Sequence, residues 1–277
     1  MKRKLFCELS PFCYRISQMK KISFRKLSDF FGGVKFAQKK SDSKLSVTIY
    51  KHSSLIRRTL GNVDMELQEN KAHNLSIAVP KVSGVIIRPG ETFSFWKLVG
   101  SVTYKKGYKD GLTISNGDTK AGVGGGMCQF TNLIHWMVLH TPLEITEHHH
   151  HDGFDLFPDF NRQIPFGTGT SIAYNYVDYR FKNNTNHIFQ LIVYLTDTHL
   201  CGEMLCDATL DDSYHISVKN EHFVRIGDDV FRKGEIYRSC IDKNTGKILS
   251  NELIRNNHAK VMYDTKNLVI QEDIPRV

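Results

Sequence analysis

The sequence lacks any hydrophobic run that is long enough to cross a membrane. Its best apolar stretches, Trp136 to Leu139 and Leu191 to Leu195, fall far short of the roughly 18 or more residues that a membrane-spanning helix needs. The basic start Lys2-Arg3-Lys4 is not followed by the apolar core of about 7–15 residues that an export signal requires. We therefore expect no transmembrane segment and no signal peptide, and a protein that is cytoplasmic or peripheral to the inner membrane face.

Cysteine is scarce as well. The six cysteines stand at positions 7, 13, 128, 201, 206 and 240 of 277 residues, which excludes the disulfide framework of a small secreted domain. We expect most of them to be reduced thiols. Cys201 and Cys206 are spaced like half of a zinc site, but the matching half is missing, and we favour a hairpin turn flanked by two half-buried thiols. The sequence predicts no cofactor and no metal.

Acidic residues are rare at the N-terminus. Residues 1–40 hold 11 Lys and Arg against 2 Asp and Glu, so they account for the net charge of +8. Apolar residues recur there at helical spacing among the basic ones, at Ile16, Met19, Leu27 and Phe30. One interpretation is an interfacial helix on an anionic membrane surface, where each basic residue contributes about 1 kcal/mol. The other is a solvated basic helix that caps the domain. Nucleic acid is not an expected partner, since no recognised binding module accompanies the charge.

Patterns of apolar residues predict the secondary structure of the rest of the chain. Residues 74–82 are typical of a helix, and residues 128–140 predict a buried helix, because their apolar positions cover more than one face. Residues 85–96 predict two short strands around a Pro89-Gly90 turn. Alternation predicts a hairpin of residues 171–181 and 188–195. Further short strands are expected around Glu203–Cys206, His215–Val218, Val224–Ile226, Glu235–Cys240 and Lys260–Tyr263.

These elements predict an α+β fold. A central buried helix follows a glycine-rich turn and packs on a mainly antiparallel sheet. We expect a basic leader over residues 1–40, the main domain over residues 41–207 and a β-rich C-terminal extension over residues 208–277.

The most informative residues are three successive glycines, Gly124, Gly125 and Gly126, shortly before Cys128. Successive glycines cost conformational entropy, so a fold that keeps them needs unusual backbone angles or a close approach by another group. Cys128 falls in the first turn of the predicted helix, where N–H groups and the helix dipole favour a thiolate and lower the thiol pKa. A nucleophile beside N–H donors is the arrangement that acyl transfer needs. The alternative is a helix entry that carries a small apolar residue.

Four consecutive histidines, ending at His151, supply candidate bases for this thiol. In an extended segment His149 and His151 share one side and the other two histidines share the opposite side, so that one pair can face Cys128. We favour a general base that is held by Asp152 or Asp155. The alternatives are an exposed polar turn and a zinc site that same-face histidines form with the cysteine.

Several blocks within residues 65–207 resemble the VanW family: ENKAHNLSIAV, IIRPGETFSFWKLVG, VGGGMCQFTNLIHW and LEITEHHHHDG. The blocks PGETFSF and GGGMCQ, in this order, are a specific signature of that family. The resemblance implies an accessory role in glycopeptide resistance or cell-wall metabolism. Some relatives that carry this domain on an exported, membrane-anchored chain are peptidoglycan L,D-transpeptidases, and they use the motif cysteine as the nucleophile.

The resemblance carries over residue by residue. The family's glycines, cysteine and glutamine are retained at Gly124, Gly125, Gly126, Cys128 and Gln129. Its acid-basic-His-x-His block aligns with residues 147–151, which makes His151 and His149 the base candidates. Its later Gly-Arg-Asp-like block reads Gly167-Thr168-Gly169 here and has lost both charges, so that any role of those charges is in doubt.

The resulting hypothesis is a two-step acyl transfer on a peptidoglycan stem peptide or its precursor. Cys128 attacks an amide carbonyl, His151 or His149 shuttles the proton, and backbone N–H groups near Gly126 stabilise the oxyanion. An amine or water then releases the thioester.

Arg88 and the turn that follows it, residues 89–94 ending at Ser94, are further candidates to line the substrate groove, although we favour a purely structural turn there. The alternative function is a non-catalytic binding or scaffold protein for a cell-wall precursor or partner enzyme at the cytoplasmic membrane face. A zinc-dependent hydrolase built on the histidines is a third hypothesis.

Overall fold

A four-stranded antiparallel sheet lies at the centre of the protein. The computed structural model describes residues 5–57, 65–115, 118–150, 153–159 and 163–272. Two helices cover the central sheet: α4 (Met127–Val138) packs against β1 and β10, and α2 (Met65–Val82) packs against β9. The predicted α+β class and buried central helix are confirmed. The strands of this sheet run in the order β1 (Val47–Leu55), β10 (His199–Cys206), β9 (Phe189–Leu195) and β2 (Val85–Ile87).

Close packing fixes α4 on the sheet. A Cβ atom at Gly202 of β10 would lie 2.5 Å from Met137 Cε and 3.1 Å from a methyl carbon of Leu133, so that a larger residue there would require the Met137 side chain to move. Phe130 and Ile134 are fully buried in the same core, and burial of each such side chain contributes about 1.5–3 kcal/mol. The first turn of α4 is therefore held in place by the rest of the helix.

Among the described residues, two smaller sheets and three short helices complete the main body. β8 (Arg180–Lys182) pairs antiparallel with β3 (Thr92–Ser94) on one side and with β6 (Glu144–Glu147) on the other. β4 (Asp110–Ser115) and β5 (Asp118–Val123) form a hairpin. The short helices are α3 (Phe95–Val99) and the 3₁₀ helices η1 (Phe6–Glu8) and η2 (Tyr104–Lys106).

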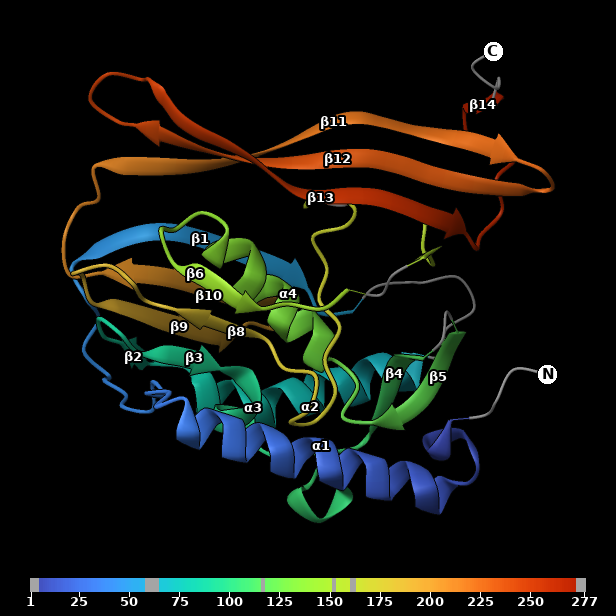
Figure 1. Cartoon of the computed structure of the whole chain (residues 1–277), viewed down its shortest axis with the longest axis horizontal. Helices are drawn as coiled ribbons and strands as arrows, with labels where there is room; N and C mark the ends of the chain where they lie inside the picture. The colour runs from blue at the N-terminus through green and yellow to red at the C-terminus, as the bar shows by residue number, and fades with distance from the viewer. Residues whose placement is uncertain (1–4, 58–64, 116–117, 151–152, 160–162, 273–277) are drawn as a thin grey trace.

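The C-terminal strands form a layer of their own (Figure 1). Arg238 of this layer donates from Nε to the Leu139 carbonyl oxygen at 2.9 Å and from its other arm to the Thr141 carbonyl, which ties the layer to the end of α4. The division at residue 208 stays a prediction. The five strands run in the order β14 (Ile270–Glu272), β11 (Asp212–Ile226), β12 (Asp229–Asp242), β13 (Ile248–Val261) and β7 (Phe154–Asp155), with parallel pairing at both edges.

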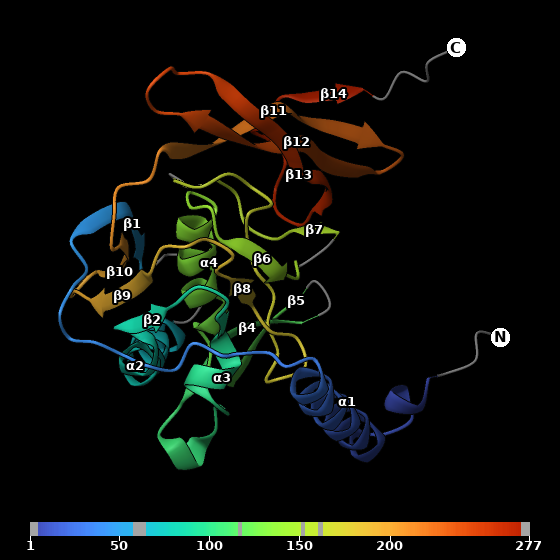
Figure 2. The same cartoon turned by 60° about the vertical axis from the view of Figure 1, so that its left-hand side comes forward.

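α1 (Pro11–Phe31) lies along the outside of the molecule, across from the C-terminal layer (Figures 1 and 2). Its inner side is held by ion pairs of Arg25 with Glu147 and of Asp29 with Arg180. None of its residues is buried. Its apolar side chains are exposed at Phe12, Met19, Phe24, Leu27, Phe30 and Phe31. In the described part of the chain, no helix is both long and apolar enough to span a membrane.

The predicted hairpin of residues 171–181 and 188–195 is wrong. Of the first segment only residues 180–181 belong to a strand, β8, which pairs with β3 and β6, whereas β9 pairs with β10 and β2. Asn175 has a φ of 56°, and the Ala173 N–H donates to the Val177 carbonyl. This turn interrupts the strand that the alternating residues predict.

Three other predictions of local structure need correction. Cys201 and Cys206 do not flank a hairpin turn, because both lie on β10. The two short strands expected at residues 215–218 and 224–226 belong to the single strand β11, and α2 begins at Met65, earlier than predicted. In each of the last two cases, the strand or helix continues through polar residues at which the sequence pattern predicted that it would end.

Candidate functional site

A cavity of about 1050 Å³ opens at the start of α4. Its described lining comes from α1, α2, α3, β1, the β4–β5 hairpin, Val102, the glycine loop, the first turns of α4 and residues 154–177. Ligand pockets for small molecules usually have about 300–1,000 Å³, so this cavity has room for a short peptide. Cys128 and Gln129 are among its lining residues.

The glycine loop needs its glycines for two separate reasons. Gly124 and Gly126 have φ values of 82° and 105°, which residues with a side chain rarely adopt. Gly125 packs against the backbone of β4, where a Cβ would lie 2.4 Å from the carbonyl carbon of Gly111. Gly126 is also the N-cap of α4 and offers no side-chain oxygen to the N–H groups of the first turn. These N–H groups have no intrahelical acceptor, which suits them to bind a carbonyl oxygen of a ligand.

The Cys128 thiol is half-buried on the cavity wall. Burial raises the pKa of this thiol, and a backbone hydrogen bond from Ile172 only partly opposes that effect. The expectation from helix position, a lowered thiol pKa, is therefore contradicted. The main cause is that burial removes hydration from the charged thiolate and so disfavours the ionised form.

A segment after the histidine tract is hydrogen-bonded to the first turns of α4. Thr170 donates from its backbone N–H and its hydroxyl to Asn132 Oδ1, at 2.6 and 2.8 Å. The Thr131 hydroxyl donates to the Cys128 carbonyl at 3.2 Å. Both threonines are buried, so this wall of the cavity is fixed close to the sulfur.

Gln129 uses its amide to hold α4 on β1. Its Nε2 donates to Ser54 Oγ and to the Leu55 carbonyl oxygen, each at 2.9 Å. The predicted substrate or oxyanion residue therefore lines the cavity while its amide N–H groups are engaged with the sheet.

The described histidines of the tract point to partners other than Cys128. His149 Nε2 lies 3.0 Å from Glu147 Oε1, and 45% of its side chain is exposed. His148 Nε2 lies 3.0 Å from the Gly169 carbonyl oxygen, and its ring lies 4.0 Å from the ring of the buried His135 on α4. Neither His148 nor His149 is among the described residues that line the cavity. A different histidine, His52 of β1, does line it.

The remaining predicted base and acid residues divide into two groups. His151 and Asp152 lie outside the described residues, so their roles stay predictions. Asp155 is buried, and its Oδ2 accepts from Arg232 at 3.3 Å and from the Tyr263 hydroxyl at 3.0 Å. It belongs to the junction with the C-terminal layer.

Arg88 and Ser94 do not line the cavity in the described part of the chain. The backbone N–H of Arg88 donates to the Glu91 carboxylate at 2.8 Å, within the turn. Ser94 is buried, caps α3 by accepting from the Lys97 N–H at 3.2 Å, and donates to Asp178. The structural turn that the sequence favoured explains both contacts.

Sequence reasoning missed two polar residues of α2 that line the cavity, Gln68 and Lys71. Both are buried, and Gln68 Oε1 has no hydrogen-bond partner among the described atoms. Lys71 packs with its stem against the glycine loop, since a Cβ at Gly126 would lie 2.7 Å from Lys71 Cγ. The signal was present: the apolar stripe at Leu75 and Ala78 continues backwards at helical spacing to positions 71 and 68.

Comparison with known proteins shows the family to which the chain belongs. The family model described as VanW like protein matches residues 70–205, which include the glycine loop and Cys128. The chain is 32% identical over 274 residues to the vancomycin B-type resistance protein VanW of Enterococcus faecalis, covering 98% of this chain and 99% of that protein. The chain belongs to the VanW family.

A second relative matches over a shorter range. The uncharacterized protein YoaR of Bacillus subtilis is 31% identical over 121 residues, which is 43% of this chain and 37% of that protein. No solved structure matches the chain.

Proposed function

We propose that this VanW-family protein is an accessory protein of glycopeptide resistance and cell-wall metabolism that binds a peptidoglycan stem peptide or its precursor beside Cys128. The observation that carries the proposal is the position of the Cys128 thiol on the wall of the 1050 Å³ cavity, next to a glycine loop and an uncapped helix start. The name of the Enterococcus relative supports the resistance role. A stem peptide is rich in amide groups, which match the buried Gln68 amide and the helix N–H groups.

The proposed chemistry is acyl transfer with Cys128 as the nucleophile. Sγ forms a bond to an amide carbonyl carbon, N–H groups of the first turn of α4 stabilise the oxyanion, and the amine leaves with a proton. An acceptor amine or water then attacks the thioester and restores the thiol. Because burial raises the pKa of this thiol, the attack needs a base. The candidates are the predicted His151 and His149 and, from the cavity lining, His52.

Non-catalytic recognition is the second candidate function. The raised pKa of the Cys128 thiol favours it, as do the contacts of His148 and His149 with groups other than the sulfur. In this case the cavity binds the cell-wall precursor or a peptide of a partner enzyme, and Cys128 only contributes to the wall.

One experiment separates the two functions. The purified protein is incubated with synthetic stem peptides while binding is followed by calorimetry and covalent adducts by intact mass. Acyl transfer predicts an adduct that disappears in Cys128→Ala and persists in the control Cys240→Ala. Recognition predicts saturable binding without an adduct, retained in Cys128→Ala. Absence of both binding and adduct would remove the proposal.

The base is identified by the same assay. His52→Ala, His149→Ala and His151→Ala are compared for the rate of adduct formation across pH. The base variant loses the rate and its pH dependence but keeps peptide affinity, whereas the other two retain both.

We also propose that the protein is peripheral to the inner membrane face and binds it through α1. The outward side of α1 carries phenylalanines with exposed fractions of 71–81% at positions 12, 24, 30 and 31, an unusual surface for a protein that meets only water. Exposed Arg15, Lys20 and Lys26 lie among them. Apolar side chains flanked by basic ones complement an anionic lipid surface. The ion pairs of Arg25 and Asp29 keep the inner side of α1 on the body of the protein.

A further inference from the structure

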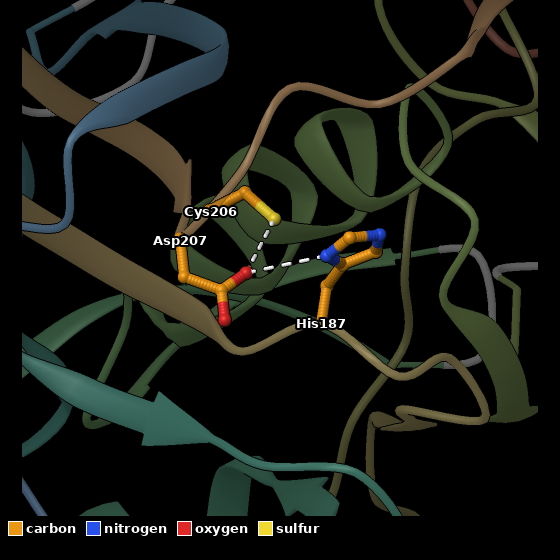
Figure 3. A group of neighbouring side chains, drawn as sticks. All are labelled: His187, Cys206 and Asp207. Carbon is orange, nitrogen blue, oxygen red and sulfur yellow. Dashed lines mark hydrogen bonds and ion pairs between the residues drawn. The ribbon is translucent and has the colours of Figure 1, made fainter.

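The ends of β9 and β10 bring together three side chains with metal-binding chemistry. His187 precedes β9, Cys206 is the last residue of β10, and Asp207 follows it (Figure 3). β9 and β10 pair with Phe189 opposite Cys206, and the Asp207 N–H donates to the Ile188 carbonyl oxygen at 3.1 Å. The sheet register itself therefore places the imidazole, the thiol and the carboxylate side by side.

The spacing of the three ligand atoms fits one face of a coordination tetrahedron. Cys206 Sγ lies 3.5 Å from Asp207 Oδ1, and His187 Nδ1 lies 3.4 Å from the same oxygen. All three atoms lie within 4.8 Å of one another. With Zn–S of about 2.3 Å and Zn–N or Zn–O of about 2.0–2.1 Å, neighbouring ligand atoms of tetrahedral zinc stand about 3.3–3.6 Å apart. Small side-chain movements suffice to close the site around an ion.

The surroundings are also suitable for an ion. Cys206 is fully buried, whereas the side chains of His187 and Asp207 are 39% and 36% exposed, so an ion has a path from solvent to the sulfur. Burial raises the pKa of the Cys206 thiol, and a bound cation displaces the thiol proton. None of the three residues is among the described lining of the Cys128 cavity.

We propose that His187, Cys206 and Asp207 bind a thiophilic divalent cation such as Zn²⁺, with water as the fourth ligand. The mixed sulfur, nitrogen and oxygen donor set favours zinc over magnesium or calcium, which prefer oxygen ligands. The ion would clamp the ends of β9 and β10 at one edge of the main body. Cys201, which the sequence paired with Cys206, lies five positions earlier on the same strand, so its side chain projects from the opposite face.

The test is a titration of metal-free full-length protein with Co²⁺, a spectroscopic substitute for zinc. We expect one ion per chain, a near-ultraviolet band from cobalt–thiolate bonding, and loss of the band when Zn²⁺ is added. Cys206→Ser should abolish the band and His187→Ala should weaken binding at least about tenfold, while Cys201→Ser behaves as the wild type. Circular dichroism checks the fold of Cys206→Ser. The exposed His187 gives an independent arm should that variant unfold.

Two results would overturn the site. One is the absence of any thiolate band at a saturating excess of cobalt. The other is a band that Cys201→Ser removes and His187→Ala leaves unchanged, which would place the ion elsewhere.

Discussion

Gly125 lies so close to Gly111 that a Cβ atom on it would stand 2.4 Å from the Gly111 carbonyl carbon. This contact joins the glycine loop before Cys128 to the β4–β5 hairpin. The backbone of β4 therefore fixes the position at which α4 begins. A flexible side chain could move away from such a contact, but the backbone of a strand cannot.

Gly125→Ala should lower the free energy of unfolding by about 1–3 kcal/mol, as overpacking against a fixed backbone does. Chemical denaturation measures this change. Gly169→Ala is the control, because a Cβ there meets only Asn132 Oδ1 at 3.9 Å. Equal stability of the two variants would contradict the close contact.

Alkylation of Cys128 should speed up with pH well beyond neutrality. Burial raises the pKa of this thiol above its ordinary value of 9.0, and the thiolate is the reactive form. The rate with iodoacetamide, followed by peptide mapping, should therefore rise about tenfold per pH unit below that pKa. A rate that levels off at or below pH 7 would show that the thiol is ionised in spite of its burial, and would favour catalysis.

Gln68→Met should stabilise the protein while weakening peptide binding. The substitution removes a buried amide oxygen that has no partner in the described structure, and such groups cost about 1–3 kcal/mol. Gln129→Met is the matched control, because it loses two hydrogen bonds to β1 and should lower stability. Denaturation and calorimetry with stem peptide measure both effects. A destabilised Gln68→Met protein would mean that the amide has a structural role.

Stability should fall as the pH drops below about 6.5, the ordinary histidine pKa, because of His135. Burial, and then the positive charges of His148, His150 and Arg238, lower the pKa of His135 in the folded state. The unfolded chain therefore takes up a proton that the folded chain does not, which costs about 1.4 kcal/mol of stability per pH unit. This contribution is present above pH 6.5 and is lost as the pH falls. His135→Gln should flatten the dependence, measured by urea denaturation between pH 5 and pH 7, and His258→Gln at an exposed position is the control.

The protein should bind vesicles that contain phosphatidylglycerol more tightly than vesicles of phosphatidylcholine alone. Phe12→Ser with Phe24→Ser should weaken binding by at least about tenfold, since each buried phenylalanine contributes about 1.5–3 kcal/mol. Lys20→Glu should weaken it only for the anionic vesicles. Leu253→Ser, at an exposed position of β13, is the control in a co-sedimentation assay. Self-association lost in the phenylalanine variants, without vesicle binding, would instead identify α1 as a contact between two copies.

Local sequence patterns correctly predicted the elements whose conformation depends on residues close together in the chain. The apolar positions of residues 128–140 predicted α4 because its burial is nearly complete. The prediction of a turn at Pro89-Gly90 was correct, because Gly90 adopts a φ of 79° that glycine accepts. The segment 171–179 failed, since its alternation reflects aromatic residues around a turn and not the two faces of a strand.

The sequence predicted only some of the residues that form the candidate site. Three glycines before a cysteine marked the loop and the helix start, and the family resemblance strengthened that prediction. Gln68, Lys71 and His52 come from other elements that tertiary packing brings to the same cavity. The histidine tract was easy to find, yet the ring of His148 lies 4.0 Å from the ring of His135 of α4, a contact between residues that no local rule connects.

The sequence by itself determined the α+β class, the glycine-dependent entry to the central helix and the basic, apolar first helix, because spacing and backbone freedom act over a few residues. Only the tertiary structure decided the direction in which burial shifts the pKa of Cys128 and of His135. It also decided the unsatisfied amide of Gln68 and the meeting of His187 with Cys206 and Asp207. Burial sets these properties, and burial depends on which distant segments pack together.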